Sequence, residues 1–203
     1  MSDQLILELA PPAPPTLDNF VVGANAAAIA ALRAAAQGAE SVVYLWGEPG
    51  CGKSHLLEAT RRAAGERVLV LDDVDALDAA AQVRAFEAFN RARGEGHPGV
   101  AAGSAPPAQL ALREDLRTRL GSGLVFQVHP LSDGEKAAAL RAQAADRGIA
   151  LPDEVAAYLL RHLPRSLAMQ LAVLDALDRY SLAHKRAVTL PLVREALAAL
   201  GIR

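Results

Sequence analysis

Residues 47–54 read Gly47-Glu48-Pro49-Gly50-Cys51-Gly52-Lys53-Ser54. This octapeptide fulfils the pattern of a phosphate-binding loop, a glycine followed after four residues by Gly-Lys-Ser. A short apolar run over 41–46, rich in strand-forming residues, precedes it, and a stretch with helical periodicity over 53–64 follows. Because the motif works between a strand and a helix, this context favours a phosphate-binding loop over a chance glycine-rich turn.

The residue types of the loop match the chemistry of a nucleoside di- or triphosphate. The glycines let backbone N–H groups turn toward the phosphates, and the start of the helix adds the positive end of its dipole. We expect Lys53 to pair with the β and γ oxygens and Ser54 to supply an oxygen to Mg²⁺. Cys51 could be a reactive thiol at the helix start, but we favour a small apolar filler of the loop.

A pair of acids follows the next apolar run. Residues 67–71 predict a buried strand that ends at Asp72-Asp73. A strand that delivers an acid to the metal is the second part of many P-loop sites, so we expect Asp72 to hold Mg²⁺ directly or through water. For Asp73 two roles are open, polarising an attacking water or capping the following helix.

Composition and charge restrict the class of protein. The chain has 203 residues, a single cysteine, a formal net charge of -2 and a pI near 6.2. It has no signal-peptide pattern and no apolar run of about 20 residues, so we expect a cytoplasmic protein without a membrane segment. Proteins that grip duplex DNA are usually basic, so strong direct, sequence-specific DNA binding is not expected. No metal-ligand spacing is found, and we expect structural or solvated roles for His55, His97, His129, His162 and Asp75.

Strand and helix signals alternate through the first part of the chain and then stop. Strands are expected over 41–46, 67–71, 100–102 and 124–128, separated by helices. This order predicts an α/β fold with a mostly parallel sheet. From residue 131 onward the periodicity is helical throughout, which predicts a small all-helical lid. The expected division is a flexible tail with a proline spacer (1–16), a nucleotide-binding base (17–130) and a helical lid (131–203).

Several side chains have expected places in the helices. Asn25 is expected to cap a helix that runs to about residue 37, and Ser132 with Glu135 to form a capping box. In the base, one helix is expected to carry Val83, Phe86 and Phe89 on roughly one side. In the lid, one helix is expected to carry Val155, Tyr158, Leu159, His162 and Leu163 on one face, and the next to turn Leu167, Leu171, Leu174 and Leu177 inward.

Several stretches together resemble the AAA+ family and, within it, the DnaA-related proteins. Residues 17–23 are similar to the family's adenine-contacting entry segment, and residues 44–57 to its P-loop neighbourhood. Further similar stretches are the sensor 1 stretch at 103–110, the arginine-finger box at 115–120 and the lid helix at 175–179. The resemblance implies an AAA+ base and lid that bind ADP or ATP with Mg²⁺. It adds Val21, Val22 and His55 to the expected nucleotide contacts and assigns an arginine finger to Arg119. On spacing alone, Arg117 and Arg119 would be a solvated helix end.

The two ends of the chain resemble the Hda regulators more than DnaA. The chain stops at Arg203, where DnaA continues into a domain that reads origin DNA. The tail segment 4–9 is similar to the Hda motif for the DNA polymerase III sliding clamp (beta subunit), with contacts expected from Gln4, Leu5, Leu7 and Leu9; the alternative is an unpaired tail. The resemblance implies a negative regulator of replication initiation that, bound to nucleotide and to the DNA-loaded clamp, stimulates hydrolysis of ATP on DnaA. The partners expected are therefore DnaA and the clamp, with a homo-oligomer as a further possibility.

The sequence departs from the family pattern at three places. Eighteen residues separate Lys53 from Asp72, too few for the additional strand and helix of most AAA+ bases, so the sheet is expected to be one strand short. Ala168 stands at the sensor 2 position, and Ser104 replaces the usual acid of the sensor 1 stretch. Three alternatives stay open: a stand-alone AAA+ ATPase, a DnaA-interacting adaptor without catalysis, and a clamp-tethered scaffold.

Overall fold

The computed structural model describes residues 13–163 and 166–199. The chain divides into two compact units at Pro130–Leu131, and each is described here by itself. We call residues 14–130 the base unit and the described residues from 131 onward the helical unit. Among the described residues, no helix is long and apolar enough to span a membrane.

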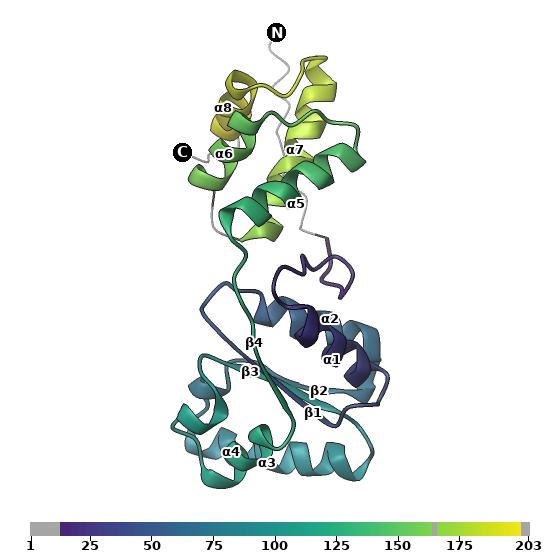
Figure 1. Ribbon diagram of the computed structural model, residues 1–203, viewed down its shortest axis with the longest axis vertical. Coiled ribbons are helices and arrows are strands. Elements are labelled where there is room, and N and C mark those ends of the chain that lie inside the picture. Colours follow the sequence, from purple (N-terminus) through teal and green to yellow (C-terminus); the bar gives the residue numbers. More distant parts are fainter. Residues whose placement is uncertain (1–12, 164–165, 200–203) are drawn as a thin grey trace. The chain divides into compact units, whose positions relative to one another are not determined.

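The base unit is built on a four-stranded parallel sheet (Figure 1). Its strands are β1 (Val42–Trp46), β2 (Leu69–Leu71), β3 (Gly99–Gly103) and β4 (Leu124–Gln127), in the spatial order β2-β3-β1-β4. Trp46 pairs with Gly103 on one side and with Gln127 on the other, so the segments that follow these strands meet at one edge of the sheet. The prediction of an α/β fold with a parallel sheet is confirmed.

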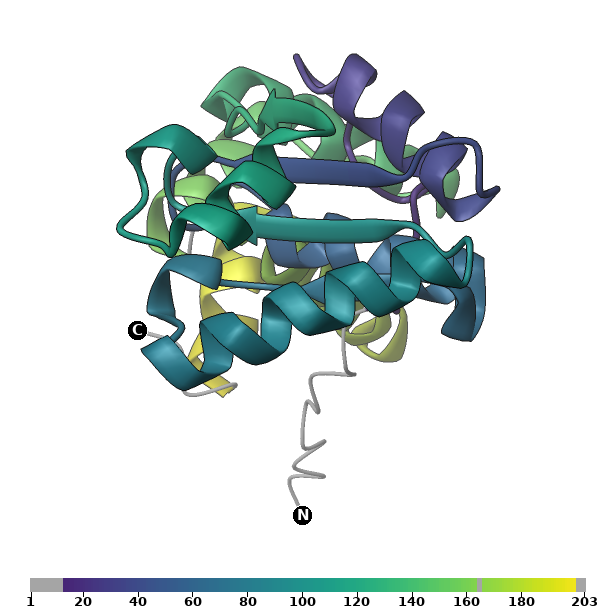
Figure 2. The same cartoon turned by 90° about the horizontal axis from the view of Figure 1, so that it is seen from below.

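Helices cover both faces of this sheet (Figures 1 and 2). The helices of the base unit are α1 (Ala26–Ala36), α2 (Lys53–Ala64), α3 (Ala79–Gly94) and α4 (Glu114–Gly121). Val43 and Leu45 of β1 face the core that contains α1 and α2, whereas Val42 and Tyr44 face the core of α3 and α4. The two-residue alternation of a strand thus gives β1 an apolar layer on each side. Because β1 is sealed on both faces, the loop that follows it starts from a rigid strand.

Three details of the base differ from the sequence expectation. The second strand begins at Leu69, because residues Gly65–Arg67 form a 3-10 turn. Asn25 stands at the N-cap position of α1, but its side chain makes no capping bond. On α3, Val83 and Phe86 are only half-buried, while Gln82 is buried because its amide donates to the Leu77 carbonyl and accepts from the Arg113 N–H.

The helical unit contains α5 (Asp133–Asp146), α6 (Asp153–His162), α7 (Leu167–His184) and α8 (Leu190–Ala199). The capping box of Ser132 and Glu135 is present at the start of α5, as predicted. Val155, Leu159, Leu163, Leu174 and Leu177 are buried as expected. Tyr158, Leu167 and Leu171 are half-buried, and His162 is exposed. The His162 ring stacks on Tyr158 at the surface, with centroids 4.0 Å apart.

Candidate nucleotide site and arginine cleft

The loop between β1 and α2 has a backbone that requires its glycines. Gly47, Gly50 and Gly52 have φ angles of 155°, 79° and 109°, in the region that side chains other than glycine rarely adopt. A Cβ atom on Gly47 would lie 2.4 Å from the Val128 carbonyl oxygen, and one on Gly52 would lie 2.7 Å from the Phe20 ring. At Gly50 nothing lies within 4 Å, so the loop is open there. The glycines therefore let the loop pass close to Val128 and Phe20 and leave it open at Gly50.

Lys53 is held by the loop itself. Its ammonium group donates to the Gly47 carbonyl at 2.7 Å and to the Glu48 carbonyl at 3.2 Å. An ammonium group has three N–H donors, and two are used here, which leaves one for a phosphate oxygen. The Lys53 Nζ also lies 4.0 Å from the Cys51 Sγ, and Cys51 is buried beneath the loop. The burial supports the packing role expected for this cysteine.

The start of α2 fits a phosphate group. The first N–H groups of any helix have no acceptor within the helix, and α2 begins without a side-chain cap. Ser54 is exposed in the first turn, beside these N–H groups. A phosphate here would accept from the backbone N–H groups and meet the positive end of the helix dipole. Ser54 would be the hydroxyl ligand of a Mg²⁺ ion bound with the nucleotide.

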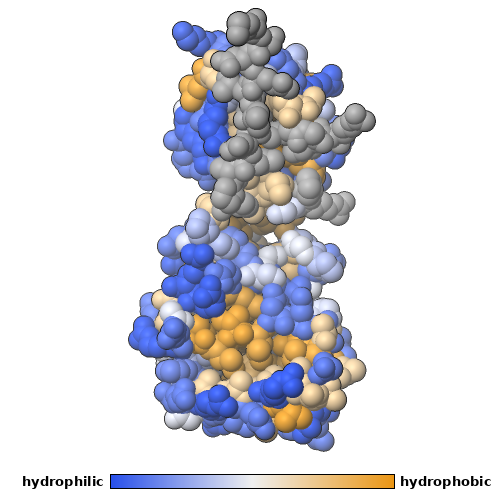
Figure 3. Space-filling model, turned by 180° about the vertical axis from the view of Figure 1, so that it is seen from behind, coloured by the Kyte–Doolittle hydropathy of each residue, from blue (hydrophilic) through white to orange (hydrophobic). Residues whose placement is uncertain are grey.

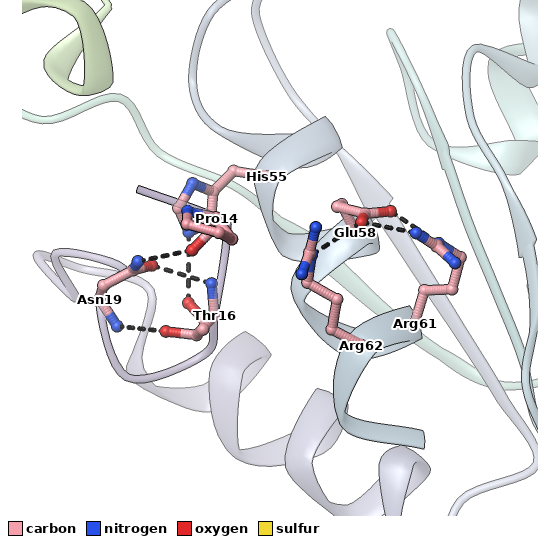
Figure 4. A network of polar contacts seen from close by, with 7 residues as sticks. All are labelled: Pro14, Thr16, Asn19, His55, Glu58, Arg61 and Arg62. Carbon is pink, nitrogen blue, oxygen red and sulfur yellow. Dashed lines mark hydrogen bonds and ion pairs between the residues drawn. The ribbon is translucent and has the colours of Figure 1, made fainter. Parts of the chain in front are cut away.

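The entry segment before α1 is folded against this loop (Figure 4). Thr16 and Asn19 bind each other through two hydrogen bonds of 2.9 and 3.0 Å, and the Asn19 amide donates to the Pro14 carbonyl at 2.9 Å. His55 contacts the Thr16 carbonyl through Nε2 at 3.2 Å, and its ring lies 5.4 Å from the Phe20 ring. These contacts fix the segment next to the first turn of α2, where Val21 is half-buried and Val22 exposed.

Burial lowers the pKa of His55 below its usual value, and the Thr16 carbonyl opposes this shift only in part. A neutral imidazole therefore forms the contact with Thr16 at neutral pH. Nε2 carries the proton in that tautomer, because it faces a carbonyl oxygen. The entry segment is thus attached to the P-loop helix by a hydrogen bond from the uncharged His55 ring.

A second connection joins the entry segment to the end of β4. The Asn25 amide donates to the His129 carbonyl at 3.0 Å, and its oxygen accepts from the His129 N–H at 2.8 Å. Val128, the preceding residue, donates to the Trp46 carbonyl at 2.7 Å, directly before the P-loop. Asn25 therefore binds the backbone on the other side of the P-loop and does not cap its own helix.

The three acids that follow β2 have different surroundings. Asp72 is exposed, and its carboxylate accepts from the Asp73 N–H at 2.9 Å. Asp73 has a positive φ of 45°, a conformation that is uncommon for residues with a side chain. Asp75 reaches across to β3, where its carboxylate accepts from the Ser104 N–H at 3.0 Å. The acid that connects β2 to the strand next to the P-loop is thus Asp75, for which the sequence suggested no special role.

The charge of Asp75 is stabilised in place. Burial disfavours its charged form, but hydrogen bonds from Ser104 and the nearby Lys53 charge outweigh that effect and lower its pKa. Burial, followed by the charge of Asp75, raises the pKa of the Tyr44 hydroxyl, which donates to the Ala105 carbonyl at 2.9 Å. A charged carboxylate therefore lies beside Ser104 and near Lys53. Among the described residues no group of three or more His, Cys, Asp or Glu side chains could hold a metal alone, so Mg²⁺ would need phosphate oxygens as well.

Arg119 lines a separate cleft of about 740 Å³ in the base unit. The cleft lies between α3 and α4, and its lining residues are Phe86, Arg113, Glu114, Asp115, Thr118, Arg119 and Ser122. The Arg119 guanidinium donates through Nη2 to the Asn90 side-chain oxygen at 2.6 Å. Its buried Nε has no hydrogen-bond partner within the described structure. Arg119 is therefore positioned by one contact and keeps unused donors.

The two sites lie on different faces of the sheet. Lys53 begins α2, which covers one face with α1, and Arg119 belongs to α4, which covers the other face with α3 (Figure 1). Asn90 was not expected from the sequence, since it is one exposed polar residue on a helix rich in such residues. The clamp-motif residues Gln4, Leu5, Leu7 and Leu9 lie outside the described residues. Ala168 is exposed on α7 of the helical unit.

Residues 133–197 match the family model of the Hda lid domain. This match is confined to the helical unit, and for the whole chain the solved structures show the AAA+ fold. Domain III of the Thermotoga maritima initiator DnaA is similar to it with a TM-score of 0.69 and 22% identity, covering 95% of this chain and 98% of that one. DnaA from Aquifex aeolicus, solved with bound AMPPCP, has a TM-score of 0.64 and 21% identity over 87% of this chain and 70% of that one. Thermotoga maritima RuvB is also similar, with a TM-score of 0.64 and 18% identity over 94% and 73%. At these identities the solved structures establish the AAA+ fold alone, and the lid match supplies the relation to DnaA-type proteins.

Proposed function

We propose that this DnaA-related protein is a negative regulator of replication initiation that stimulates hydrolysis of ATP on DnaA. Bound to nucleotide and, through residues 4–9, to the DNA-loaded sliding clamp, it would dock on DnaA in the cytoplasm. Arg119 would enter the active site of DnaA as an arginine finger. The observation that carries this proposal is the Arg119 guanidinium, which lines the cleft beside α4 and is oriented through Nη2 by a hydrogen bond to Asn90.

The position of Arg119 favours action in trans. An arginine finger works by stabilising charge that develops on the transferred phosphoryl group, and it needs free N–H donors to do so. Arg119 lies on the sheet face opposite the helix of its own P-loop, so a phosphate outside this base unit is the better target. The P-loop would hold ADP or ATP in a structural or regulatory role, with Mg²⁺ at Ser54 and Asp72. The adenine nucleotide analogue in the Aquifex DnaA structure supports this choice of ligand.

The test is hydrolysis of ATP bound to the cognate DnaA in the presence of DNA-loaded clamp. The wild-type chain should accelerate hydrolysis, and Arg119→Ala should lose about 10³-fold or more of that effect. Arg117→Ala is the matched control, because it removes an arginine from the same helix and should leave most of the stimulation. A variant without residues 4–9 should reach the same rate of hydrolysis only at a much higher concentration. Absence of stimulation by the wild-type chain would exclude the proposal.

A second candidate function is ATP hydrolysis by the chain itself. Asp73 favours it, because a carboxylate with an uncommon backbone conformation stands after the strand that delivers Asp72. Steady-state turnover of the isolated chain, compared with Asp73→Asn, distinguishes the two candidates. Turnover that is lost with Asp73 while DnaA hydrolysis is unaffected would favour the stand-alone ATPase.

A further inference from the structure

The cleft beside α4 contains an acid that is placed to meet Arg119. The base unit presents an apolar area on the face shown in Figure 3, but the lining side chains of the cleft, apart from that of Phe86, are polar or charged. Asp115 and Arg119 both line it and stand four residues apart on α4. Side chains at this spacing on a helix are neighbours, and an acid that precedes a base is the favourable order for an ion pair. Asp115 is thus a suitable partner for the Arg119 guanidinium.

The Asp115 carboxylate is bound by Arg113 instead. The Arg113 guanidinium donates through Nε to Oδ1 at 3.2 Å and through Nη2 to Oδ2 at 2.8 Å. Oδ1 also accepts from the Leu116 N–H at 2.7 Å. Chiefly through the Arg113 hydrogen bonds, the pKa of the Asp115 carboxyl lies below its usual value, so the group is charged at neutral pH. Because a guanidinium fork that binds both oxygens fixes the plane of a carboxylate, Arg113 holds Asp115 in one orientation.

Arg119 is left with an uncharged partner. Within the part of the chain that the structure describes, it forms no ion pair with Asp115, and its Nη2 donates to the Asn90 side-chain oxygen at 2.6 Å. Glu114, the other acid of the cleft, precedes Arg119 by five residues, a spacing that does not bring side chains together on a helix. A neutral acceptor orients the guanidinium without offsetting its charge, and that charge is what an arginine finger supplies. The arrangement around Arg119 therefore leaves its charge available.

We propose that Arg113 controls the availability of Arg119 by holding the Asp115 carboxylate away from it. This inference rests on the proposed function, in which Arg119 acts on DnaA. Without Arg113, the Asp115 side chain turns toward Arg119 and forms the ion pair that their spacing favours. Docking on DnaA must then break this pair before the guanidinium can meet the phosphate. Arg113 is thus a positioning residue that acts through Asp115.

The first test is the rate of ATP hydrolysis on DnaA, measured with saturating chain and DNA-loaded clamp. Exposed ion pairs are weak, so Arg113→Ala should reduce the stimulation by about two- to fivefold. Combining it with Asp115→Asn should restore the rate, because asparagine has no charge with which to bind Arg119. Arg84→Ala, which removes an exposed arginine from α3, is the control and should match wild type.

The rescue separates this role from two others. Arg113→Ala keeps the backbone N–H that binds Gln82, and the Arg113 side chain is 49% exposed, so the base unit should still fold. If Arg113 contacted DnaA directly or only stabilised α4, removal of the Asp115 charge would not restore the rate. The proposal is overturned by wild-type rates for Arg113→Ala, or by a double variant that is no faster than Arg113→Ala alone.

The second test needs no DnaA and therefore separates this proposal from the proposed function. NMR titration of the Asp115 carboxyl in the full-length chain gives its pKa directly. Arg119→Ala should have little effect on that pKa while Arg113 is present. In the Arg113→Ala background, Arg119→Ala should raise the pKa of Asp115 by about 0.3, the value of one helical ion pair. Equal responses in the two backgrounds would overturn the proposal, whereas a wild-type chain that does not stimulate DnaA would exclude the proposed function alone.

Discussion

The P-loop and the cleft beside α4 each present a cation that we expect to meet a phosphate, but they are built differently. Lys53 is fixed by two carbonyls of its own loop, within a backbone that glycines shape. Arg119 is fixed by a single side-chain contact to Asn90, and its Nε has no partner within the described structure. The P-loop positions its cation through its own backbone, whereas the cleft positions Arg119 through one side chain of another helix. This difference fits our proposal that the first site binds its phosphate in cis and that the second acts on a phosphate from elsewhere.

The P-loop half of this comparison is tested most severely by adding a Cβ atom to one of its glycines. Gly47→Ala should destabilise the protein by about 3 kcal/mol, because the added Cβ would lie 2.4 Å from the Val128 carbonyl oxygen at a positive φ. Gly50→Ala is the control, since its φ is also positive but nothing lies within 4 Å, and it should cost about 1 to 2 kcal/mol. Denaturant unfolding measures both. Equal losses would mean that the loop is not anchored on the end of β4.

Removal of the Lys53 ammonium tests whether the loop binds nucleotide in cis. Lys53→Ala should weaken binding of ADP or ATP about 10- to 100-fold, the value of a charge-assisted hydrogen bond to phosphate. Arg84→Ala removes an exposed cation from α3 and should leave the affinity unchanged. Titration calorimetry gives both values. If Arg119→Ala weakened nucleotide binding as much as Lys53→Ala, the proposed difference between the two sites would be wrong.

The sequence predicts the P-loop better than the Arg119 cleft, because the first is a local structure and the second depends on contacts between distant residues. The P-loop is a local structure whose glycines, strand and helix lie within about 25 consecutive residues, and the expected start of α2 at Lys53 is met. The Ser132–Glu135 capping box is local as well, and it is present. The contact of Asn90 with Arg119 spans 29 residues and that of Asn25 with His129 spans 104. Neither has a spacing rule, so the sequence could suggest Arg119 by resemblance but could not suggest what holds it.

Buried polar groups were the other source of error. Gln82 replaces Val83 on the inner side of α3 because its amide satisfies two backbone groups, one just before α3 and one just before α4. A hydrophobic pattern ranks a glutamine as outward-facing and cannot register such bonds. Asp75 is exposed, but it was overlooked for a related reason, since its partner Ser104 directly follows the neighbouring strand β3.

Loss of the Asn90 contact tests the other half of the comparison. Asn90→Ala should reduce the stimulation of DnaA by about tenfold, less than Arg119→Ala, because the guanidinium remains but is no longer oriented. Glu87→Ala, an exposed change one turn earlier on α3, is the control. Rates should be compared at saturating chain concentration, so that weaker docking does not imitate a loss of orientation. A rate for Asn90→Ala equal to that of wild type would show that the cleft itself holds Arg119.

The smallest expected effect is the pH dependence of the hydrogen bond between His55 of the P-loop helix and the Thr16 carbonyl of the entry segment. Burial lowers the folded-state pKa of His55, so the unfolded chain binds this proton more readily than the folded chain does. The stability that comes from the neutral ring is therefore complete above about pH 6.5 and is lost as the pH falls below that value. His55→Gln keeps a donor for the Thr16 carbonyl without a titrating ring. The melting temperature of the wild-type chain should consequently fall by a few degrees more than that of His55→Gln between pH 7 and pH 5. Parallel curves for the two proteins would mean that the contact between His55 and the Thr16 carbonyl does not depend on the charge of His55.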